Sequence, residues 1–323
     1  MASPFPPNFH PYHPIQIEKL HIRDKLVELL GLDEIPIKVG YDSIREMKTE
    51  QIKTTHISYR NSLEESVPGI LMIPRTNCTS NRAGIVCIPG TRGCAEDLAN
   101  SSFYESREGR LFGWARELTT RGFATLSITP KGSLSRCPNP KEWATEQKLL
   151  QPYGRTQMGL LVEETLKAAR ILASTPNVDP NRIGLTGFSL GGNATWYAMA
   201  CASWIAAGVP LCGGLGSLAA VIQHGDSDRH SGYFYIPHML RYFDHPELAA
   251  ACIPPRPFMI VAPTEDEDMP RKGVDNLALA VSKSYAAAGY SERFKVHQPK
   301  GSHRFLLEYF EWMANWFGLF LKK

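Results

Sequence analysis

The chain has 323 residues, and its 35 lysine and arginine residues nearly balance 32 aspartate and glutamate residues, which leaves a net charge of +3. This balance, without a basic stripe among aromatic residues, argues against a nucleic-acid or anionic-membrane partner, and no run approaches the roughly 18 apolar residues of a membrane span. The hydrophobic fraction of 43% is ample for a sizeable core.

The first half of the chain starts with a proline-rich segment, after which apolar residues at helical spacing predict a helix over 17–30. Residues 49–59 alternate between polar and apolar like a strand, and 69–73 is expected to pair with them as an antiparallel hairpin. Regular alternation then begins. It predicts strands over 83–88 and 123–128, and helices over 112–120 and 156–173.

The second half continues this alternation. It predicts strands over 183–186, 205–210, 257–262 and 294–297, and helices over 193–202, 274–288 and 309–321. Strands that alternate with helices over this length predict an α/β fold, with a doubly wound, mainly parallel sheet of about eight strands and helices on both faces. The aromatic C-terminal helix could also support a homodimer.

The chain carries no linker, low-complexity run or fixed-period repeat, so we expect a single domain over 1–323. Residues 1–48 would form an N-terminal extension and helix. Two long connections, 131–157 and 213–250, interrupt the alternation near strand ends, and connections of this length are usually functional or disordered. We interpret them as insertions near the active site, forming a small cap.

Seven cysteines are scattered along the chain, and several fall inside predicted strands or helices. This odd-numbered pattern is typical of free thiols in a reducing compartment. The N-terminus also lacks the apolar core of a secretory signal. We therefore expect a cytoplasmic location, unless a signal segment has been removed from the chain.

The most informative motif is Gly187-Phe188-Ser189-Leu190-Gly191, which joins a predicted strand directly to a predicted helix. A serine at such a corner occupies a strained turn, with its hydroxyl projecting clear of the backbone. Glycines are needed on both sides, because side chains there would collide as the strand and the helix close on each other. The motif predicts a nucleophile elbow at Ser189, although a glycine-rich turn in any α/β protein would share the pattern.

A serine nucleophile needs an acid and a base, which follow it in this order along the chain of such hydrolases. The strand at 257–262 leads into the acidic run 265–268, and the strand at 294–297 leads into His303. These loops meet at one sheet edge, because it is formed by the carboxyl ends of parallel strands. His303 would take the serine proton, and a carboxylate would orient its ring. His297, inside its strand, is interpreted as structural.

Several stretches resemble the dienelactone hydrolase and acetyl xylan esterase-like branch of the α/β-hydrolases. The resemblance runs from about Gly69 to the C-terminus, and its most specific part is Asn177-Val178-Asp179-Pro180-Asn181-Arg182-Ile183-Gly184. It continues at 235–237, 240–244, 253–257 and 301–303. The resemblance implies an α/β-hydrolase fold and a Ser-His-Asp catalytic triad.

The resemblance also selects the acid and marks two departures. In that family the acid lies four residues before a proline, so Pro270 points to Asp266 instead of Glu265, Glu267 or Asp268. The family often carries His-Gly after its third strand, where this chain has Ile88-Pro89-Gly90-Thr91. An aspartate common after the fourth strand is replaced by Thr129-Pro130-Lys131-Gly132, which hints at an unusual pocket.

An oxyanion hole would need two backbone N–H donors for the charge that develops on the substrate carbonyl oxygen. The amide of Leu190, directly after the serine and at a helix N-terminus, is the first candidate. The turn Gly90-Thr91-Arg92 would supply the second. The resemblance favours Thr91, because the residue after the glycine has this role in the family.

The substrate pocket is expected beside this turn and under the aromatic-rich connection 213–250. We interpret Arg92, Tyr233, Tyr235 and His238 as pocket residues. The aromatic side chains of the connection would equally serve as the core of a small cap.

No metal and no cofactor is expected. His224, Asp226, Asp228 and His230 form a metal-like cluster on paper, but such spacing among Gly, Ser and Asp is more typical of a solvated loop. The segment 213–216 lacks the Gly-x-Gly-x-x-Gly spacing of a dinucleotide site.

The leading hypothesis is a serine hydrolase of the carboxylesterase type, which cleaves small acyl or acetyl esters of a small-molecule substrate. A prolyl oligopeptidase-like peptidase would share this catalytic domain, but no propeller precedes it here. A carbon–carbon bond hydrolase of a biosynthetic pathway would use the same triad. A catalytically inactive hydrolase-fold binding protein would be expected to lose a triad residue, whereas this chain has a candidate for each.

Overall fold

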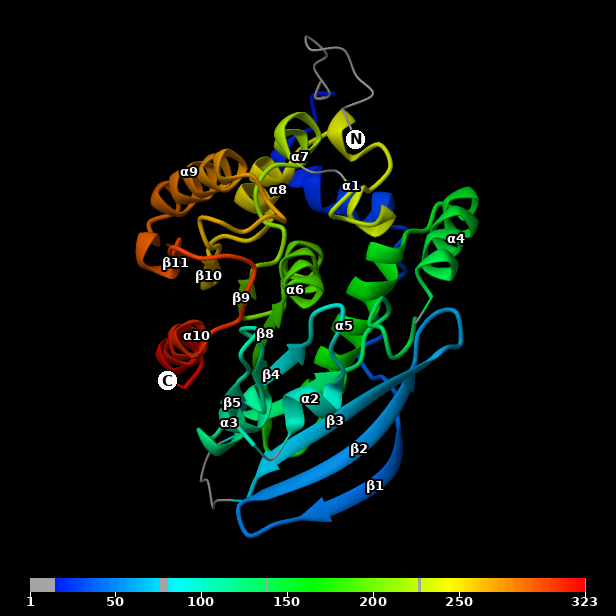
Figure 1. The fold of residues 1–323 in the computed structure, drawn as a ribbon, viewed down its shortest axis with the longest axis vertical. Coiled ribbons are helices and arrows are strands. Elements are labelled where there is room, and N and C mark those ends of the chain that lie inside the picture. The colour runs from blue at the N-terminus through cyan, green and yellow to red at the C-terminus, as the bar shows by residue number, and fades with distance from the viewer. Residues whose placement is uncertain (1–14, 76–80, 101, 138, 226–227, 323) are drawn as a thin grey trace.

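The computed structural model describes residues 15–75, 81–100, 102–137, 139–225 and 228–322. Within these ranges the main sheet has nine strands in the order β1-β2-β3-β7-β4-β8-β9-β10-β11 (Figure 1). Their bounds are β1 Asp42–Lys48, β2 Ile52–Arg60, β3 Ser66–Pro74, β4 Arg82–Ile88, β7 Ala124–Ile128, β8 Val178–Phe188, β9 Ala207–Leu211, β10 Phe258–Val261 and β11 Phe294–His297.

The strands from β7 to β11 pair in parallel, whereas β1, β2 and β3 form an antiparallel edge next to β7. This arrangement confirms the predicted α/β fold with a mainly parallel sheet. The sheet has nine strands instead of about eight, because β1 was not predicted. All residues of β1 are exposed, so the strand depends on its backbone pairing with β2 and shows no apolar alternation.

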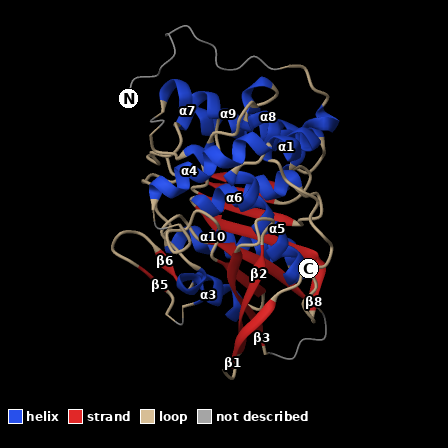
Figure 2. Cartoon of the chain, turned by 90° about the vertical axis from the view of Figure 1, so that its right-hand side faces the viewer, coloured by secondary structure: helices blue, strands red, loops and turns tan. Residues whose placement is uncertain are grey.

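Helices cover both faces of the sheet (Figures 1 and 2). Along β4, Val86 and Ile88 join one hydrophobic cluster while Ile85 and Cys87 join the other, since alternate side chains point to opposite faces. The first cluster includes α1 Ile22–Leu30, α5 Gln157–Ala173, α6 Leu190–Cys201, α8 His245–Cys252 and α9 Arg271–Ala287. The second includes α2 Ala95–Ala99, α3 Trp114–Thr120 and α10 Leu307–Leu321.

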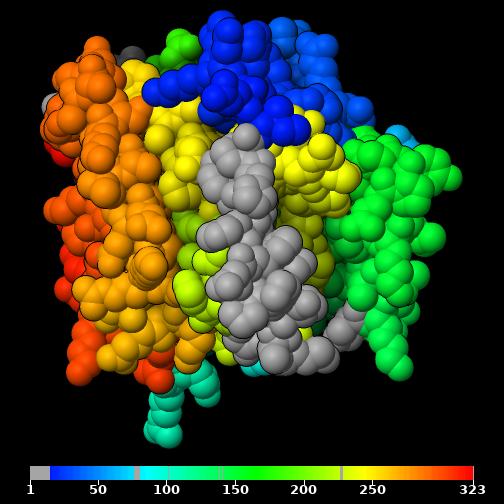
Figure 3. All heavy atoms as spheres, turned by 90° about the horizontal axis from the view of Figure 1, so that it is seen from above, coloured from blue at the N-terminus to red at the C-terminus, as the bar shows by residue number. Residues whose placement is uncertain are grey.

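The two predicted insertions contain helices and lie against each other. The first holds α4 Pro140–Leu150 and the second holds α7 Leu218–His224. The indole Nε1 of Trp143 in α4 donates a hydrogen bond to Ser231 Oγ at 2.9 Å. Figure 3 shows α4 in green beside the yellow segment that precedes and includes α8.

Two smaller features complete the fold. Strands β5 Tyr104–Glu105 and β6 Leu111–Phe112 form a separate two-stranded sheet, which the sequence did not predict. Short 3-10 turns occur at Lys19–His21, Gln151–Tyr153, Gly232–Phe234, Met239–Arg241 and Ser291–Arg293. In the described ranges, no helix has both the length and the hydrophobicity that a membrane crossing requires.

Candidate active site

The turn between β8 and α6 has the geometry expected of a nucleophile elbow. Ser189 has φ 56° and ψ −115°, a backbone conformation that residues other than glycine rarely adopt. A residue held in such a conformation typically lowers the stability of the fold by about 1–3 kcal/mol, and residues of this kind are often found at active sites. A Cβ on Gly187 would lie 2.5 Å from the backbone of Gly191, and a Cβ on Gly191 would meet the Ile88 carbonyl oxygen. The two glycines therefore permit the close approach that holds Ser189 in this turn.

Asp266 and His303 come together from the loops after β10 and β11. The Nδ1 atom of His303 lies 2.9 Å from Asp266 Oδ1 and 3.1 Å from Oδ2. Asp268 Oδ2 lies farther away, at 3.4 Å from the same nitrogen. Asp266 Oδ1 also accepts the backbone N–H of Asp268 at 2.9 Å, which fixes the acidic loop. The geometry thus favours Asp266 over Asp268 as the direct partner of the histidine ring.

The environment of His303 raises its pKa. Burial lowers the pKa, but the hydrogen bond to Asp266 and the charges of Asp266 and Asp268 together outweigh it. The guanidinium of Arg229, 2.9 Å from Asp268 Oδ1, acts in the opposite direction. A histidine with a raised pKa is a stronger base, although it is neutral only at higher pH.

Ser189 and His303 line the same cavity, which has a volume of about 640 Å³. The His303 ring packs against Phe188, with ring centroids 4.9 Å apart, on the residue before the serine. In the described part of the chain, no hydrogen bond joins the Ser189 hydroxyl to the imidazole. Such contacts are often longer before substrate binds.

Of the two predicted oxyanion donors, one lines the cavity and the other directly follows Ser189. Thr91 lines it directly, in the turn after β4. Leu190 is the first residue of α6, so its amide belongs to the group of helix-start N–H donors that have no intrahelical partner. The carbonyl oxygen of Thr91 accepts the backbone N–H of Leu134 at 2.8 Å, which ties the turn to the loop after β7.

The walls of the cavity differ from the predicted pocket. Arg92 lines it, as expected, but Tyr233, Tyr235 and His238 are not among its lining residues. Tyr233 instead packs on Trp143 of α4, and His238 is exposed in a left-handed turn with φ 65°. Tyr233 therefore contributes to the contact between the two insertions.

Sequence reasoning missed the other side of the cavity. Its wall includes Glu108, Arg110 and Phe112, from the segment that carries β5 and β6, together with Trp114 of α3. A strand of two residues is too short to show alternation, so no periodic signal marked this segment. Phe305, two residues after His303, also lines the cavity.

Of the metal-like cluster of the sequence, His230 belongs to no group of potential metal ligands in the described part of the chain. Its ring stacks on Phe234 at 3.9 Å and its Nε2 lies 2.5 Å from the Asp268 carbonyl oxygen, while Asp226 lies outside the described residues. A different group has ligand atoms within 4.8 Å of one another, namely Cys212, Asp266 and His303. These atoms already serve as hydrogen-bond partners, since Cys212 Sγ donates to the Arg304 carbonyl oxygen at 3.4 Å.

Comparison with known proteins places the chain among hydrolases. "Putative hydrolase YtaP" of Bacillus subtilis (strain 168) is 26% identical over 284 residues, which cover 87% of this chain and 92% of that protein. Two solved structures share the α/β-hydrolase fold. A glucuronoyl esterase from Solibacter usitatus has a TM-score of 0.67 at 13% identity, and the match covers 92% of this chain and 91% of the esterase. An acetyl xylan esterase from Paenibacillus sp. R4 has a TM-score of 0.65 at 17% identity, and the match covers 96% of this chain and 98% of the esterase.

The family model of the dienelactone hydrolase family matches residues 115–306, which is more than half of the chain. The matched range includes the elbow at Ser189, the loop of Asp266 and the loop of His303. The predicted resemblance is therefore confirmed, and the chain belongs to the dienelactone hydrolase family.

Proposed function

We propose that the protein is a serine hydrolase that cleaves carboxylic esters through an acyl-enzyme. One observation carries this proposal: the strained Ser189 and the Asp266-bound His303 line a single cavity. Strained backbone is often retained where it presents a reactive group. A buried carboxylate on the far nitrogen of a histidine is the arrangement that prepares the ring to accept a serine proton.

The proposed reaction uses these groups in order. Ser189 Oγ attacks the ester carbon while its proton passes to His303, and the carbonyl electron pair moves to the oxygen. The amides of Leu190 and Thr91 stabilise that oxyanion. The imidazolium then returns its proton to the leaving alcohol, which leaves the acyl group on Ser189. Water, activated in turn by His303, releases the acid and restores the serine.

The proposed substrates are small acyl or acetyl esters of a polar alcohol. The cavity wall combines charged side chains such as Glu108 and Arg110 with aromatic ones such as Phe112 and Phe188. Polar groups of this kind fix the orientation of a ligand, and apolar surface supplies contact area. The names of the two structural neighbours, acetyl xylan esterase and glucuronoyl esterase, support an ester of a sugar as the first class to test.

Short-chain p-nitrophenyl esters, together with a fluorophosphonate directed at serine, test the proposal. We expect turnover that is abolished by one phosphonyl adduct, located at Ser189 by peptide mass spectrometry. Ser189→Ala should lose both turnover and labelling. Ser174→Ala is the matched control, because the hydroxyl of that serine donates to the Ile171 carbonyl oxygen at the end of α5, away from the cavity. Undiminished turnover by Ser189→Ala would refute the proposal.

A further inference from the structure

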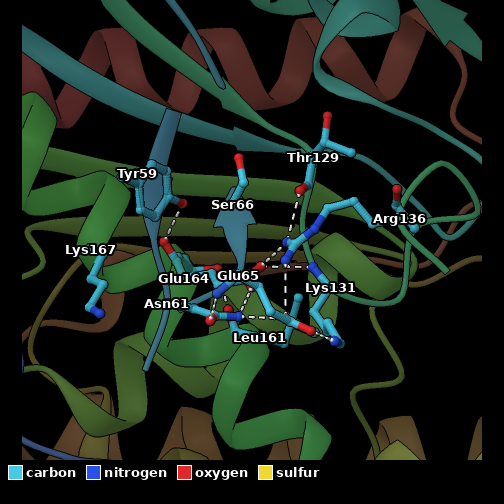
Figure 4. A network of polar contacts seen from close by, with 12 residues as sticks. Tyr59, Asn61, Glu65, Ser66, Thr129, Lys131, Arg136, Leu161, Glu164 and Lys167 are labelled. Atoms are coloured by element: carbon cyan, nitrogen blue, oxygen red, sulfur yellow. Dashed lines mark hydrogen bonds and ion pairs between the residues drawn. The ribbon is translucent and has the colours of Figure 1, made fainter. Parts of the chain in front are cut away.

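A network of ion pairs, buried at Glu164 and partly exposed at Glu65 and Glu146, surrounds the loop 129–137, where the sequence departs from its family. Arg136 lies 2.7 Å from Glu164 of α5, whose side chain is fully buried (Figure 4). The Lys131 ammonium lies 2.5 Å from Glu65 and 2.5 Å from Glu146. The network therefore joins the loop to the β2–β3 turn, to α4 and to α5.

Stability is a poor explanation for burying the pair of Arg136 and Glu164. The loss of hydration commonly cancels the attraction within a buried ion pair, so apolar residues of the same volume would hold the fold as well. Burial raises the pKa of Glu164 even though Arg136 and Lys131 act to lower it. Networks of this kind are better suited to fixing one arrangement of the backbone.

The network fixes the backbone of the loop at both of its ends. At the start of the loop, the backbone N–H of Lys131 donates to Glu164 Oε2 at 2.7 Å. Near its end, Arg136 Nη1 donates both to the same carboxylate oxygen at 2.7 Å and to the Thr129 carbonyl oxygen at 3.2 Å. Figure 4 shows these contacts converging on Glu164. Glu164 and Arg136 thus clamp the two ends of one loop.

The clamped loop in turn holds the turn after β4 at two points. The backbone N–H of Leu134 donates to the Thr91 carbonyl oxygen at 2.8 Å. The hydroxyl of Thr129 accepts the backbone N–H of Ala95, at the start of α2, at 2.9 Å. Thr91 and Ala95 lie on either side of the turn 92–94, so both of its ends are tied to the loop.

We propose that Arg136 and Glu164 are positioning residues for the oxyanion hole, which act on the Thr91 amide through the loop 129–137. This inference rests on the proposed function, because it assigns Thr91 as an oxyanion donor. Loss of a donor commonly costs 10²–10³ in kcat. A displaced donor should cost less, and we expect roughly a tenfold fall.

Arg136→Met tests the inference on a p-nitrophenyl ester. We expect kcat to fall about tenfold with little change in KM, because a donor that acts on the oxyanion favours the transition state over the bound substrate. Lys167→Met is the matched control. Lys167 lies on the same helix as Glu164 and pairs with Glu163 at 2.7 Å, apart from the contacts that hold the loop (Figure 4).

An inhibitor that mimics the oxyanion separates positioning from general loosening. A trifluoromethyl ketone would add to Ser189 Oγ, and its oxyanion would occupy the hole. We expect its inhibition constant to rise in Arg136→Met by the same factor as kcat/KM falls, while a matched alcohol that forms no oxyanion binds unchanged. Equal weakening of both inhibitors would overturn the proposal.

A double variant tests whether Arg136 acts through the Thr91 amide. Thr91→Pro removes that N–H, so Arg136→Met should have little further effect on kcat in the Thr91→Pro background. Full additivity would refute the proposed path. If Arg136→Met does not fold, Arg136→Lys retains the charge but loses the forked donor, and a smaller fall of the same kind is expected. If Ser189→Ala is inactive but kcat is unchanged in the Arg136 variants, the proposed function would stand and only this inference would be refuted.

Discussion

Arg256 offers a quantitative test of what holds the helix that begins at Ser189. Its guanidinium donates to five backbone carbonyl oxygens, those of Met199, Ala202, Ile205, Cys252 and Ile253, at 2.7–3.2 Å. The first two lie at the C-terminal end of α6. Burial lowers the pKa of Arg256 to about 10, so the group is still charged at neutral pH. One side chain thus donates hydrogen bonds to carbonyl oxygens at the C-terminal ends of both α6 and α8.

Arg256→Met would remove five hydrogen bonds from these carbonyl groups. The Cys252 carbonyl oxygen would keep its bond from Arg23, and those of Ala202 and Ile253 would keep a backbone N–H donor. A hydrogen bond contributes about 0.5–1.5 kcal/mol net, so five of them contribute roughly 2.5–7.5 kcal/mol. The guanidinium no longer has to be desolvated in the variant, which offsets part of this value. We expect the free energy of unfolding to fall by about 3–5 kcal/mol.

Urea denaturation with linear extrapolation measures this change, provided that the slope is the same in both proteins. Arg271→Met is the control, because Arg271 is exposed and its 3.8 Å ion pair with Asp275 should contribute less than about 1 kcal/mol. A loss below about 1 kcal/mol for Arg256→Met would refute the reasoning, since the five contacts would then be no stronger than an exposed pair.

Two further predictions concern the site. Because the pKa of His303 is raised, kcat/KM should rise with pH through a pKa above the ordinary histidine value. Asp268→Asn should move this rise to lower pH, since the Asp268 charge raises the pKa of His303. A pH–rate profile that is unchanged in the variant would exclude the Asp268 carboxylate as a cause of the raised pKa. The same group stabilises the fold below its unfolded pKa, a contribution that is lost as pH rises through the folded value. Gly191→Ala should lower the free energy of unfolding by about 3 kcal/mol or more, because its Cβ would meet the Ile88 carbonyl oxygen. Gly318→Ala, whose Cβ would have no neighbour within 4 Å outside its own helix, should be neutral or stabilising in thermal unfolding.

The sequence was most informative where burial sets a period. The strands at 183–186 and 294–297 and the helix at 156–173 were recognised because their apolar residues recur at the spacing that the core requires. The approach of Asp266 to His303 followed from the parallel sheet, which gathers its strand ends at one edge.

Other features leave no such trace. Strand β1 is exposed along its whole length, and β5 and β6 have two residues each, so neither shows alternation. The cavity wall depends on how these segments lie. Tyr233, Tyr235 and His238, which were predicted as pocket residues, are not among the residues that line it. The choice between Asp266 and Asp268 was likewise beyond periodicity, since both stand in one loop, and it came from the family resemblance.

The position of β5 and β6 outside the main sheet separates two tasks within one chain. The scaffold that carries Ser189 and His303 depends on the register of the large sheet, whereas Arg110 and Phe112 stand on a small hairpin of their own. The hairpin is nevertheless tied to the segment after His303, because the backbone N–H of Phe305 donates to the Gly109 carbonyl oxygen at 2.9 Å. A grafted hairpin that is meant to change the proposed substrate preference would therefore have to retain this contact, while the register of the main sheet would be unaffected.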